Sequence, residues 1–155
     1  MQKMKKIEMI TSKGSMKFEL YEKETPKTVE NFIKLSKQGF YDGLHFHRVL
    51  PSFVIQGGCP FSKEMSNPRV GTGGPGYSID CETTAEKQYH DRGVLSMAHA
   101  GKNTGGSQFF ICHNRDNTQH LDGVHTCFGK IYEGDEFIDN IEQGDKIVSI
   151  KIVEE

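Results

Sequence analysis

The sequence lacks an excess of charge of one sign and lacks any long apolar run. Nineteen Lys and Arg residues stand against 21 Asp and Glu residues, and the net charge is −2 at pH 7. No field of one sign would therefore draw in a nucleic acid or an anionic membrane. No stretch approaches the ~20 apolar residues that a membrane span needs, and the first residues contain no apolar run of signal-peptide length. We expect a monomeric, cytoplasmic protein that binds neither nucleic acid nor a membrane.

Paired cysteine motifs are also missing. The chain has 4 cysteines, and none forms the C-x-x-C pair that is typical of zinc or redox sites. Outside such a pair, a cysteine behaves as a small apolar residue that prefers the protein interior. We therefore expect four buried or half-buried thiols, at Cys59, Cys81, Cys112 and Cys127.

The residues that are present fit one globular domain spanning positions 1–155. A chain of 155 residues and 17.5 kDa has the usual size of one domain and is too short for two cores of ordinary size. Glycine accounts for 17 residues and hydrophobic residues for 35% of the chain. This balance indicates a folded protein that is rich in turns.

The apolar pattern predicts mostly strands. Residues 7–10 and 16–20 flank a turn around Gly14, and the alternation of apolar and polar residues there predicts a hairpin. Five further short apolar runs follow, at 46–55, 93–98, 108–112, 126–131 and 148–152. Together they make about seven strands or more, which is the pattern of a β-sandwich or a closed barrel.

Only two helices are indicated. Thr25 and Pro26 resemble an N-cap followed by proline at the first helical position, and apolar residues then recur at helical spacing until Gly39. Asp135 begins a second amphipathic stretch, which Gly144 ends. Two helices are too few to connect a parallel sheet of this many strands.

Two glycine-rich segments, 57–76 and 100–107, show little periodicity, and loops of this length in a small domain are usually functional. Within the first, Gly71–Gly76 matches the G-x-G-x-x-G spacing of dinucleotide-binding folds. That fingerprint must follow a buried strand and open a helix, and the residues on either side of this segment predict neither. We therefore interpret it as a mobile, turn-rich loop and expect no nucleotide site.

His45 and His47 are two positions apart, so on a strand both would point to one face, as in the metal site of a cupin-type barrel. The glutamate that should follow is missing, because Pro51 and Ser52 stand in its place. Without a carboxylate or a third histidine the spacing does not define a metal site. We expect no metal and no cofactor, and a cupin-like metal-dependent enzyme is the distant alternative.

An arginine inside an apolar run is the most informative single residue. Arg48 lies in the run 46–55, where a guanidinium is costly unless it reaches water, a carboxylate or a ligand. Arg48, Val54 and Gln56 share strand parity, and Gln108 and Phe110 share a face of another strand. Taken singly, Arg48 is as well interpreted as a surface ion-pair residue, and Phe110 as part of a minor core cluster.

Four longer motifs resemble the cyclophilin family of peptidyl-prolyl isomerases, in the same order and with matching intervals. They are FHRVLPSFVIQGG, GVLSMAHAG, GGSQFFIC and HLDGVHTCFGK, and PKTVENF in the first predicted helix also resembles the family. The resemblance implies a mainly β fold: a closed eight-stranded antiparallel β-barrel capped by two short α-helices. Because the interior of so small a barrel is filled by side chains, the substrate groove would lie on its outer surface.

The same resemblance implies a role for individual residues. Arg48 would be the catalytic residue of an enzyme that accelerates rotation about X-Pro bonds in peptides and proteins, assisting folding or conformational switching. The implied substrate-binding residues are His47, Phe53, Val54, Gln56, Ala98, His99, Ala100, Gln108, Phe110, His120, Leu121 and His125. A non-catalytic scaffold that only binds proline peptides in the same groove is the main alternative.

Three of these residues depart from the common family pattern. Val54 stands where methionine is common, His99 where asparagine is common, and His120 where many members have tryptophan. The smaller Val54 should loosen the proline pocket slightly. The family resemblance also implies a surface for the drug cyclosporin, and we expect His120 to weaken that binding because its ring is smaller than an indole.

Overall fold

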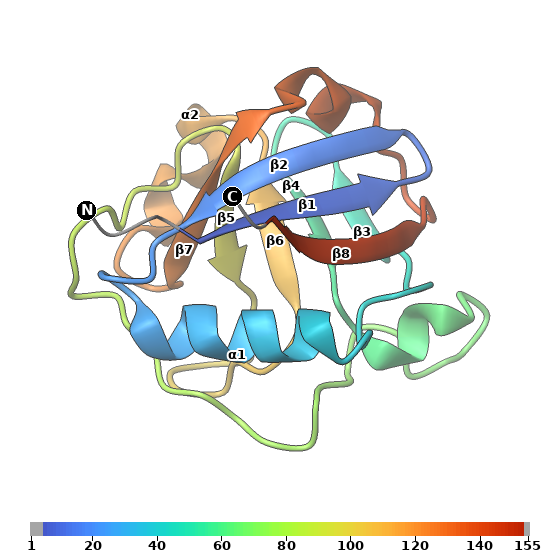
Figure 1. The fold of residues 1–155 in the computed structure, drawn as a ribbon, viewed down its shortest axis with the longest axis horizontal. Helices are drawn as coiled ribbons and strands as arrows, with labels where there is room; N and C mark the ends of the chain where they lie inside the picture. Colours follow the sequence, from blue (N-terminus) through green and yellow to red (C-terminus); the bar gives the residue numbers. More distant parts are fainter. Residues whose placement is uncertain (1–4, 154–155) are drawn as a thin grey trace.

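Eight antiparallel strands form one strongly curled sheet in the computed structural model, which describes residues 5–153 (Figure 1). The strands are β1 (Lys6–Thr11), β2 (Gly14–Leu20), β3 (Arg48–Leu50), β4 (Val54–Gly57), β5 (Val94–Met97), β6 (Phe109–Cys112), β7 (Cys127–Glu133) and β8 (Ile147–Val153). Their order across the sheet is β3-β4-β6-β5-β7-β2-β1-β8. The mainly β, eight-stranded antiparallel architecture with two helices is therefore confirmed.

The sheet is not a fully closed barrel, because its two edge strands do not pair and only a few backbone contacts join the edges. β3 and β8 are the end strands of the sheet order. Just before them, the Phe46 amide donates to the Asp145 carbonyl at 2.8 Å, and the Ile147 amide donates to the Leu44 carbonyl at 2.7 Å. A single bridge between His45 and Lys146 lies in the same place. Residues 43–46 and 144–147 thus join the edges without a full ladder between the edge strands.

The run 46–55 forms two strands, which is why the sheet has one strand more than the seven counted from the apolar runs. The chain reverses at Pro51 and Ser52, and Ser52 takes a positive φ of 66°. β3 and β4 then pair with Leu50 opposite Val54 and Arg48 opposite Gln56. A turn inside an apolar run gives a weak periodic signal, because each arm is only three or four residues long.

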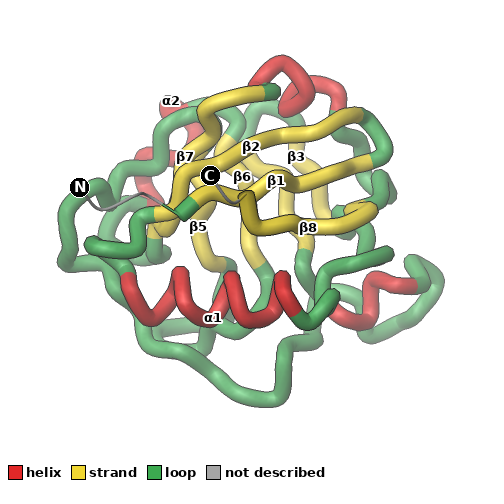
Figure 2. The backbone as a smooth tube through the Cα atoms, viewed as in Figure 1, coloured by secondary structure: helices red, strands yellow, loops and turns green. Residues whose placement is uncertain are grey.

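The first predicted helix is confirmed. Helix α1 (Pro26–Lys37) has proline at its first turn, and the chain leaves it through Gly39 at a φ of 72°. It crosses one end of the curled sheet (Figure 2) and buries Val29, Phe32 and Ile33.

The second predicted helix differs in type and length. Residues 135–144 contain a 3-10 helix, η3 (Asp135–Asn140), and the chain is extended again at Ile141. Ile138 and Ile141 are both buried in the core, so packing adds to the i→i+3 hydrogen bonds of the 3-10 helix in holding this segment. The second α-helix is the short α2 (Arg115–Thr118), which continues into η2 (Gln119–Leu121), and a further 3-10 turn is η1 (Pro60–Lys63).

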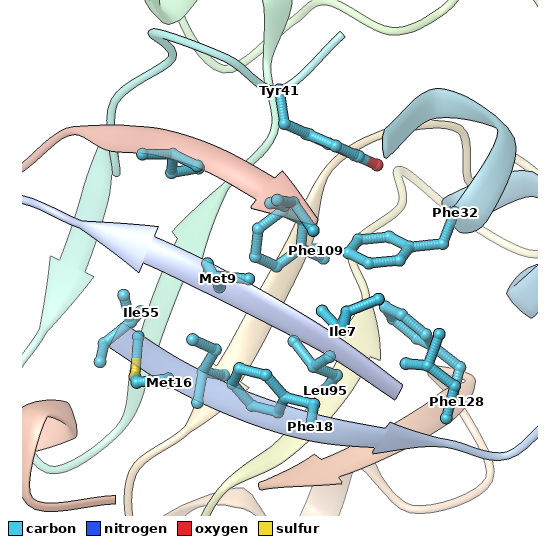
Figure 3. Packing of buried hydrophobic residues seen from close by; sticks show 14 of the residues in the cluster. Ile7, Met9, Met16, Phe18, Phe32, Tyr41, Ile55, Leu95, Phe109 and Phe128 are labelled. Carbon is cyan, nitrogen blue, oxygen red and sulfur yellow. The ribbon is translucent and has the colours of Figure 1, made fainter. Parts of the chain in front are cut away.

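The main core fills the inside of the curled sheet (Figure 3). Alternating residues of each strand point inward, so Ile7 and Met9 of β1 meet Met16 and Phe18 of β2 with none of the four exposed. Phe32 of α1 packs against three other core rings, those of Tyr41, Phe109 and Phe128.

A second, smaller apolar cluster lies apart from the main core. It comprises Tyr21, Val54, Val94, Phe110, Cys112 and Cys127, with Phe53, Ala98 and Leu121 packed against it. Phe110 belongs to this cluster whereas its neighbours Phe109 and Ile111 belong to the main core, so β6 separates the two as the alternation predicts. The small cluster therefore lies on the outer face of the sheet, with the partly buried Phe53, Ala98 and Leu121 at its edge.

None of the four cysteines forms a disulfide. Cys59, Cys112 and Cys127 are buried and Cys81 is half-buried, as expected, and all four are free. Among residues 5–153, no helix has the length and apolar character needed to cross a membrane.

Candidate functional site

A chain of hydrogen bonds links Arg48 to a glycine loop across the outer face of the sheet. Arg48 Nη1 donates to Gln56 Oε1 at 3.1 Å, and Gln56 Nε2 donates to Gln108 Oε1 at 3.1 Å. Gln108 Nε2 in turn donates to the carbonyls of Gly71 and Gly73, each at 2.9 Å. This Arg48–Gln56–Gln108 chain fixes one edge of an exposed guanidinium, and the predicted common face of Arg48, Val54 and Gln56 is confirmed by the β3–β4 pairing.

An apolar floor lies beside this chain. Gln56 is opposite Phe110 in the β4–β6 pair, and Val54 is opposite Cys112, so the small cluster and the polar chain share two strands. Phe110 is almost fully buried, while Phe53 and Leu121 are half-buried at the rim of the cluster. The Phe53 ring also stacks on the exposed His120 ring, with centroids 5.9 Å apart. Apolar surface therefore lies next to a polar chain that begins at an exposed cation.

Two stacked histidines form the wall next to Phe110. The rings of His99 and His125 lie 4.1 Å apart and nearly parallel, and His125 meets the Phe110 ring edge-on at 5.4 Å. His125 Nδ1 donates to the Met97 carbonyl at 2.9 Å. Burial lowers the pKa of His125, against the raising effect of this hydrogen bond, so the ring is neutral at pH 7.

The hydrogen bonds of His99 fix its ring in one orientation. Its Nε2 lies 2.8 Å from the Val124 carbonyl and therefore carries the proton, while its Nδ1 accepts from the Gly101 amide at 3.2 Å. Both ring nitrogens are used within the protein, so His99 offers the groove a ring face.

A cavity of about 640 Å³ continues from the polar chain. Gln56 and Gln108 line it together with Ala98, His99 and Ala100. The rest of its walls comes from the two glycine-rich segments and the two residues that follow the first of them, at 71–78, 104 and 106–107. Both predicted functional loops thus border one cavity, and Gly71–Gly76 leads into turns rather than into a helix.

His45 and His47 contact different segments. His45 Nδ1 lies 2.6 Å from the Ser62 carbonyl, whereas the His47 ring packs beside Gly71. Burial lowers the pKa of His47, and its buried Nδ1 has no hydrogen-bond partner. Within residues 5–153, no three His, Cys, Asp or Glu side chains are grouped as metal ligands.

Hydrogen bonds link Arg48, Gln56 and Gln108, and the small apolar cluster contains or contacts Phe53, Val54, Ala98, Phe110 and Leu121. The other candidates lie against these two groups: His120 stacks on Phe53, His125 on His99 and edge-on to Phe110, and Ala100 lines the cavity. His47 lies apart, beside Gly71. Sequence reasoning missed several neighbours that hold the groove in place. Cys59 Sγ accepts from the amides of Gly71 and Gly73, each at 3.3 Å. His90 packs behind Phe110 with ring centroids 5.8 Å apart. These contacts join segments far apart in the chain, so no local spacing in the sequence could have signalled them.

Comparison with known proteins identifies relatives over nearly the whole chain. Residues 6–154 match the family model described as cyclophilin type peptidyl-prolyl cis-trans isomerase/CLD. The peptidyl-prolyl cis-trans isomerase B of Bacillus subtilis (strain 168) is 53% identical over 139 residues, which cover 90% of this chain and 91% of that protein. A peptidyl-prolyl cis-trans isomerase of Synechococcus elongatus is 51% identical over 145 residues, covering 92% of each chain.

Two solved structures of one further protein are similar to this chain over nearly its whole length. A crystal structure of a Cryptosporidium parvum cyclophilin type peptidyl-prolyl cis-trans isomerase has a TM-score of 0.86 at 32% sequence identity, covering 99% of both chains. Another crystal structure of that protein, in the presence of the dipeptide Ala-Pro, has a TM-score of 0.84 at 34% identity and covers 97% of this chain and 99% of that one.

Proposed function

The chain belongs to the cyclophilin-type peptidyl-prolyl cis-trans isomerase family and is a peptidyl-prolyl cis-trans isomerase, and we propose that it uses Arg48 and the apolar cluster around Phe110 to rotate X-Pro bonds. Its ligands are proline-containing peptides. The proposal extends to prolines in folding or switching protein chains, bound by one monomeric copy.

The reaction sets clear demands on the site. Rotation about an X-Pro bond breaks amide conjugation against a barrier of ~18–20 kcal/mol, and no covalent bond is cleaved. In the twisted transition state the imide nitrogen becomes pyramidal and regains its lone pair. A donor placed near that nitrogen therefore binds the transition state more strongly than the planar ground state, which lowers the barrier.

Arg48 meets this demand. Its guanidinium is permanently charged and planar, with several N–H donors and no proton to exchange. Gln56 accepts from Nη1 and leaves the other donors of the guanidinium for a substrate. Because the Gln56–Gln108 link is tied to the Gly71–Gly73 loop, the direction of the guanidinium is set before substrate arrives.

The apolar cluster supplies the anchor for the proline ring. In this proposal Phe53 and Leu121 form the rim of a proline pocket and Phe110 forms its floor, beside Val54; all four belong to the small apolar cluster or pack against it. Burying an apolar side chain of proline's size contributes roughly 1.5 kcal/mol, and the dry surroundings strengthen the field of a neighbouring cation. With the ring held, the rest of the peptide turns, with Ala98, His99 and Ala100 along its path.

The observation that carries this proposal is the placement of Arg48, through Gln56, at the edge of the Phe110 cluster. Its test is the cis-to-trans rate of a short X-Pro peptide with and without the protein at micromolar concentration. We expect a large acceleration. Binding of the peptide without acceleration would support the scaffold alternative, and activity that requires a metal found by elemental analysis of the purified protein would support the cupin-like one.

A further inference from the structure

His90 is a fully buried histidine that lies directly behind the proposed proline pocket. Its ring stacks on Phe110, with centroids 5.8 Å apart and planes at 15°. The Phe110 ring also contacts His125, whose ring meets it edge-on. The floor of the pocket therefore rests on the ring of His90.

The same residue holds the segment that carries the opposite rim of the pocket. Both the backbone amide of His90 and its Nδ1 donate to Asp122 Oδ1, at 2.8 and 2.9 Å. The His90 carbonyl accepts from Thr118 Oγ1 at 2.7 Å. Thr118 and Asp122 are the residues on either side of η2 (Gln119–Leu121). His90 is therefore hydrogen-bonded to both ends of the turn that contains His120 and Leu121.

Further contacts surround the His90 ring. Asp122 Oδ2 accepts from Arg115 Nη2 at 2.9 Å, and His90 Nε2 accepts from Ser96 Oγ at 2.8 Å. The Cys127 thiol lies 3.4 Å from Nδ1. Burial lowers the pKa of His90 although Asp122 opposes the shift, so the ring is neutral and both ring nitrogens have defined roles.

We propose that His90 is a positioning residue for the proline pocket, which fixes the distance between the Phe110 floor and the Leu121 rim. The inference rests on the function proposed above and assigns a role to a residue that touches no substrate. His90 and Thr118 are fully buried, and both ring nitrogens, the amide and the carbonyl of His90 are in hydrogen bonds, so His90 has few alternative arrangements and the width of the pocket is defined before a peptide binds. Loss of these bonds would let the η2 turn move relative to Phe110.

The inference predicts which kinetic constant should change. The proline ring packs in the pocket equally in the ground state and in the twisted transition state. Loosening the pocket therefore weakens the binding of both states by the same amount, which raises KM and leaves kcat unchanged. Arg48 acts in the transition state, so its loss should lower kcat instead. A residue that only stabilised the fold would lower the melting temperature without changing either constant of the folded enzyme.

The experiment compares His90→Asn with His113→Asn. His113 also pairs with an aspartate, through Nε2 and Asp139 Oδ1 at 3.3 Å, and it stands outside the Phe110 cluster, so it is a matched control. For a short X-Pro peptide, at a temperature where circular dichroism shows both variants folded, we expect KM to rise at least fivefold in His90→Asn with kcat within twofold. His113→Asn should leave both within twofold. An unchanged KM in His90→Asn would overturn the inference.

A milder pair of variants covers the case in which His90→Asn does not fold. Thr118→Val removes only the hydroxyl that donates to the His90 carbonyl, and Thr118→Ser retains it. We expect KM to rise at least twofold in Thr118→Val and to return to the original value in Thr118→Ser. Equal KM values in all three proteins would refute the positioning role.

The failure of this inference and that of the proposed function are distinguishable. The dissociation constant of a proline peptide is measured without turnover, by titration, and should rise by the same factor as KM. If the unchanged chain binds peptide without accelerating rotation, the proposed function fails, whereas the effect of His90→Asn on the dissociation constant still decides the role of His90.

Discussion

Gln56 lies directly opposite Arg48 in the β3–β4 hairpin and accepts a hydrogen bond from its Nη1 atom at 3.1 Å. Among residues 5–153, Arg48 has no carboxylate within ion-pair distance, so the interpretation of Arg48 as a surface ion-pair residue does not hold. A neutral partner orients the guanidinium and leaves its charge available to a substrate.

Replacement of Arg48 by alanine should remove most of the activity and leave the fold intact. The lost interaction belongs chiefly to the transition state. We expect the transition state to lose ~2–4 kcal/mol of stabilisation, which lowers kcat/KM roughly 30- to 1,000-fold. Arg48→Lys should recover only part, because an ammonium lacks the planar fork. Arg69→Ala is the control, since the Arg69 side chain packs over the Phe61 ring. Near-normal activity in a folded Arg48→Ala protein would remove Arg48 from the mechanism.

Replacement of Gln56 by leucine should have a smaller effect of the same kind. The near-isosteric leucine fills the space but frees Arg48 Nη1 and Gln108 Oε1, so the guanidinium loses its fixed direction. We expect kcat to fall roughly 3- to 10-fold, which corresponds to the ~0.5–1.5 kcal/mol of one hydrogen bond. Steady-state kinetics at saturating peptide measures this. A kcat equal to that of the unchanged enzyme would show that Arg48 needs no partner.

The loop between β4 and the cavity depends on a glycine. Gly58 has a φ of 92°, and a Cβ there would lie 2.4 Å from the backbone oxygen of Ser107. Gly123 also has a positive φ, of 77°, but open space around it. We expect Gly58→Ala to destabilise the fold by more than about 3 kcal/mol and Gly123→Ala by only about 1 kcal/mol, as measured by urea unfolding. Equal losses would mean that the backbone conformation alone sets the cost.

Strand alternation made much of the fold predictable, because it is a local property of the sequence. Phe109 and Phe110 are adjacent and equally apolar, yet their opposite directions on β6 follow from position alone. The same rule placed Arg48 and Gln56 on one face. The family resemblance implied the eighth strand, but the apolar runs did not reveal it, and they did not reveal the 3-10 character of residues 135–140. The reversal at Ser52 and the packing of Ile138 depend on the assembled core.

The parts of the site that could not be predicted from residue patterns are contacts over long distances in the chain. Gln108 reaches the carbonyls of Gly71 and Gly73, and His90 reaches Asp122. Such pairs share no spacing rule and form only after the sheet has curled. The roles of His99 and Leu121 rested on the family resemblance, and their positions beside Phe110 are consistent with those roles.

Stability should fall as the pH drops from 7 to 5. Burial lowers the pKa values of His47, His90, His113 and His125 below the ~6.5 of an unfolded chain. Above pH 6.5 both states are neutral and stability is complete. Below pH 6.5 these histidines bind protons in the unfolded chain but stay neutral in the folded one. The free energy of unfolding therefore falls with pH until the lower pKa values of the folded chain are reached.

Urea unfolding at pH 7.5, 6.5 and 5.0 measures this loss. Asp122 and Asp139 have pKa values below the usual value of 3.8, so the stability they contribute is lost only at still lower pH and does not enter this window. For a fully buried group such as His90, the slope is at most about 1.4 kcal/mol per pH unit. A free energy of unfolding that stays constant from pH 7.5 to 5.0 would contradict the neutral, buried state of these rings.

His120 offers a test that separates drug binding from catalysis. Its exposed ring stacks on Phe53 at the rim of the proposed proline pocket, and the family resemblance implies that residue 120 covers part of cyclosporin. A histidine ring covers less apolar area than an indole. At ~25 cal/mol per Å², a deficit of some 40–80 Å² weakens binding by ~1–2 kcal/mol, or about 5- to 30-fold.

His120→Trp should therefore tighten cyclosporin binding at least fivefold. The larger ring can keep its stacking on Phe53. In the proposed binding mode a short proline peptide packs on Phe53, Phe110 and Leu121 rather than on residue 120, so kcat/KM should change less than about threefold. Titrating the drug into both proteins while following peptide isomerisation measures both quantities. Equal inhibition constants would show that His120 lies outside the drug surface, whereas a parallel rise in kcat/KM would place residue 120 in the peptide-binding site itself.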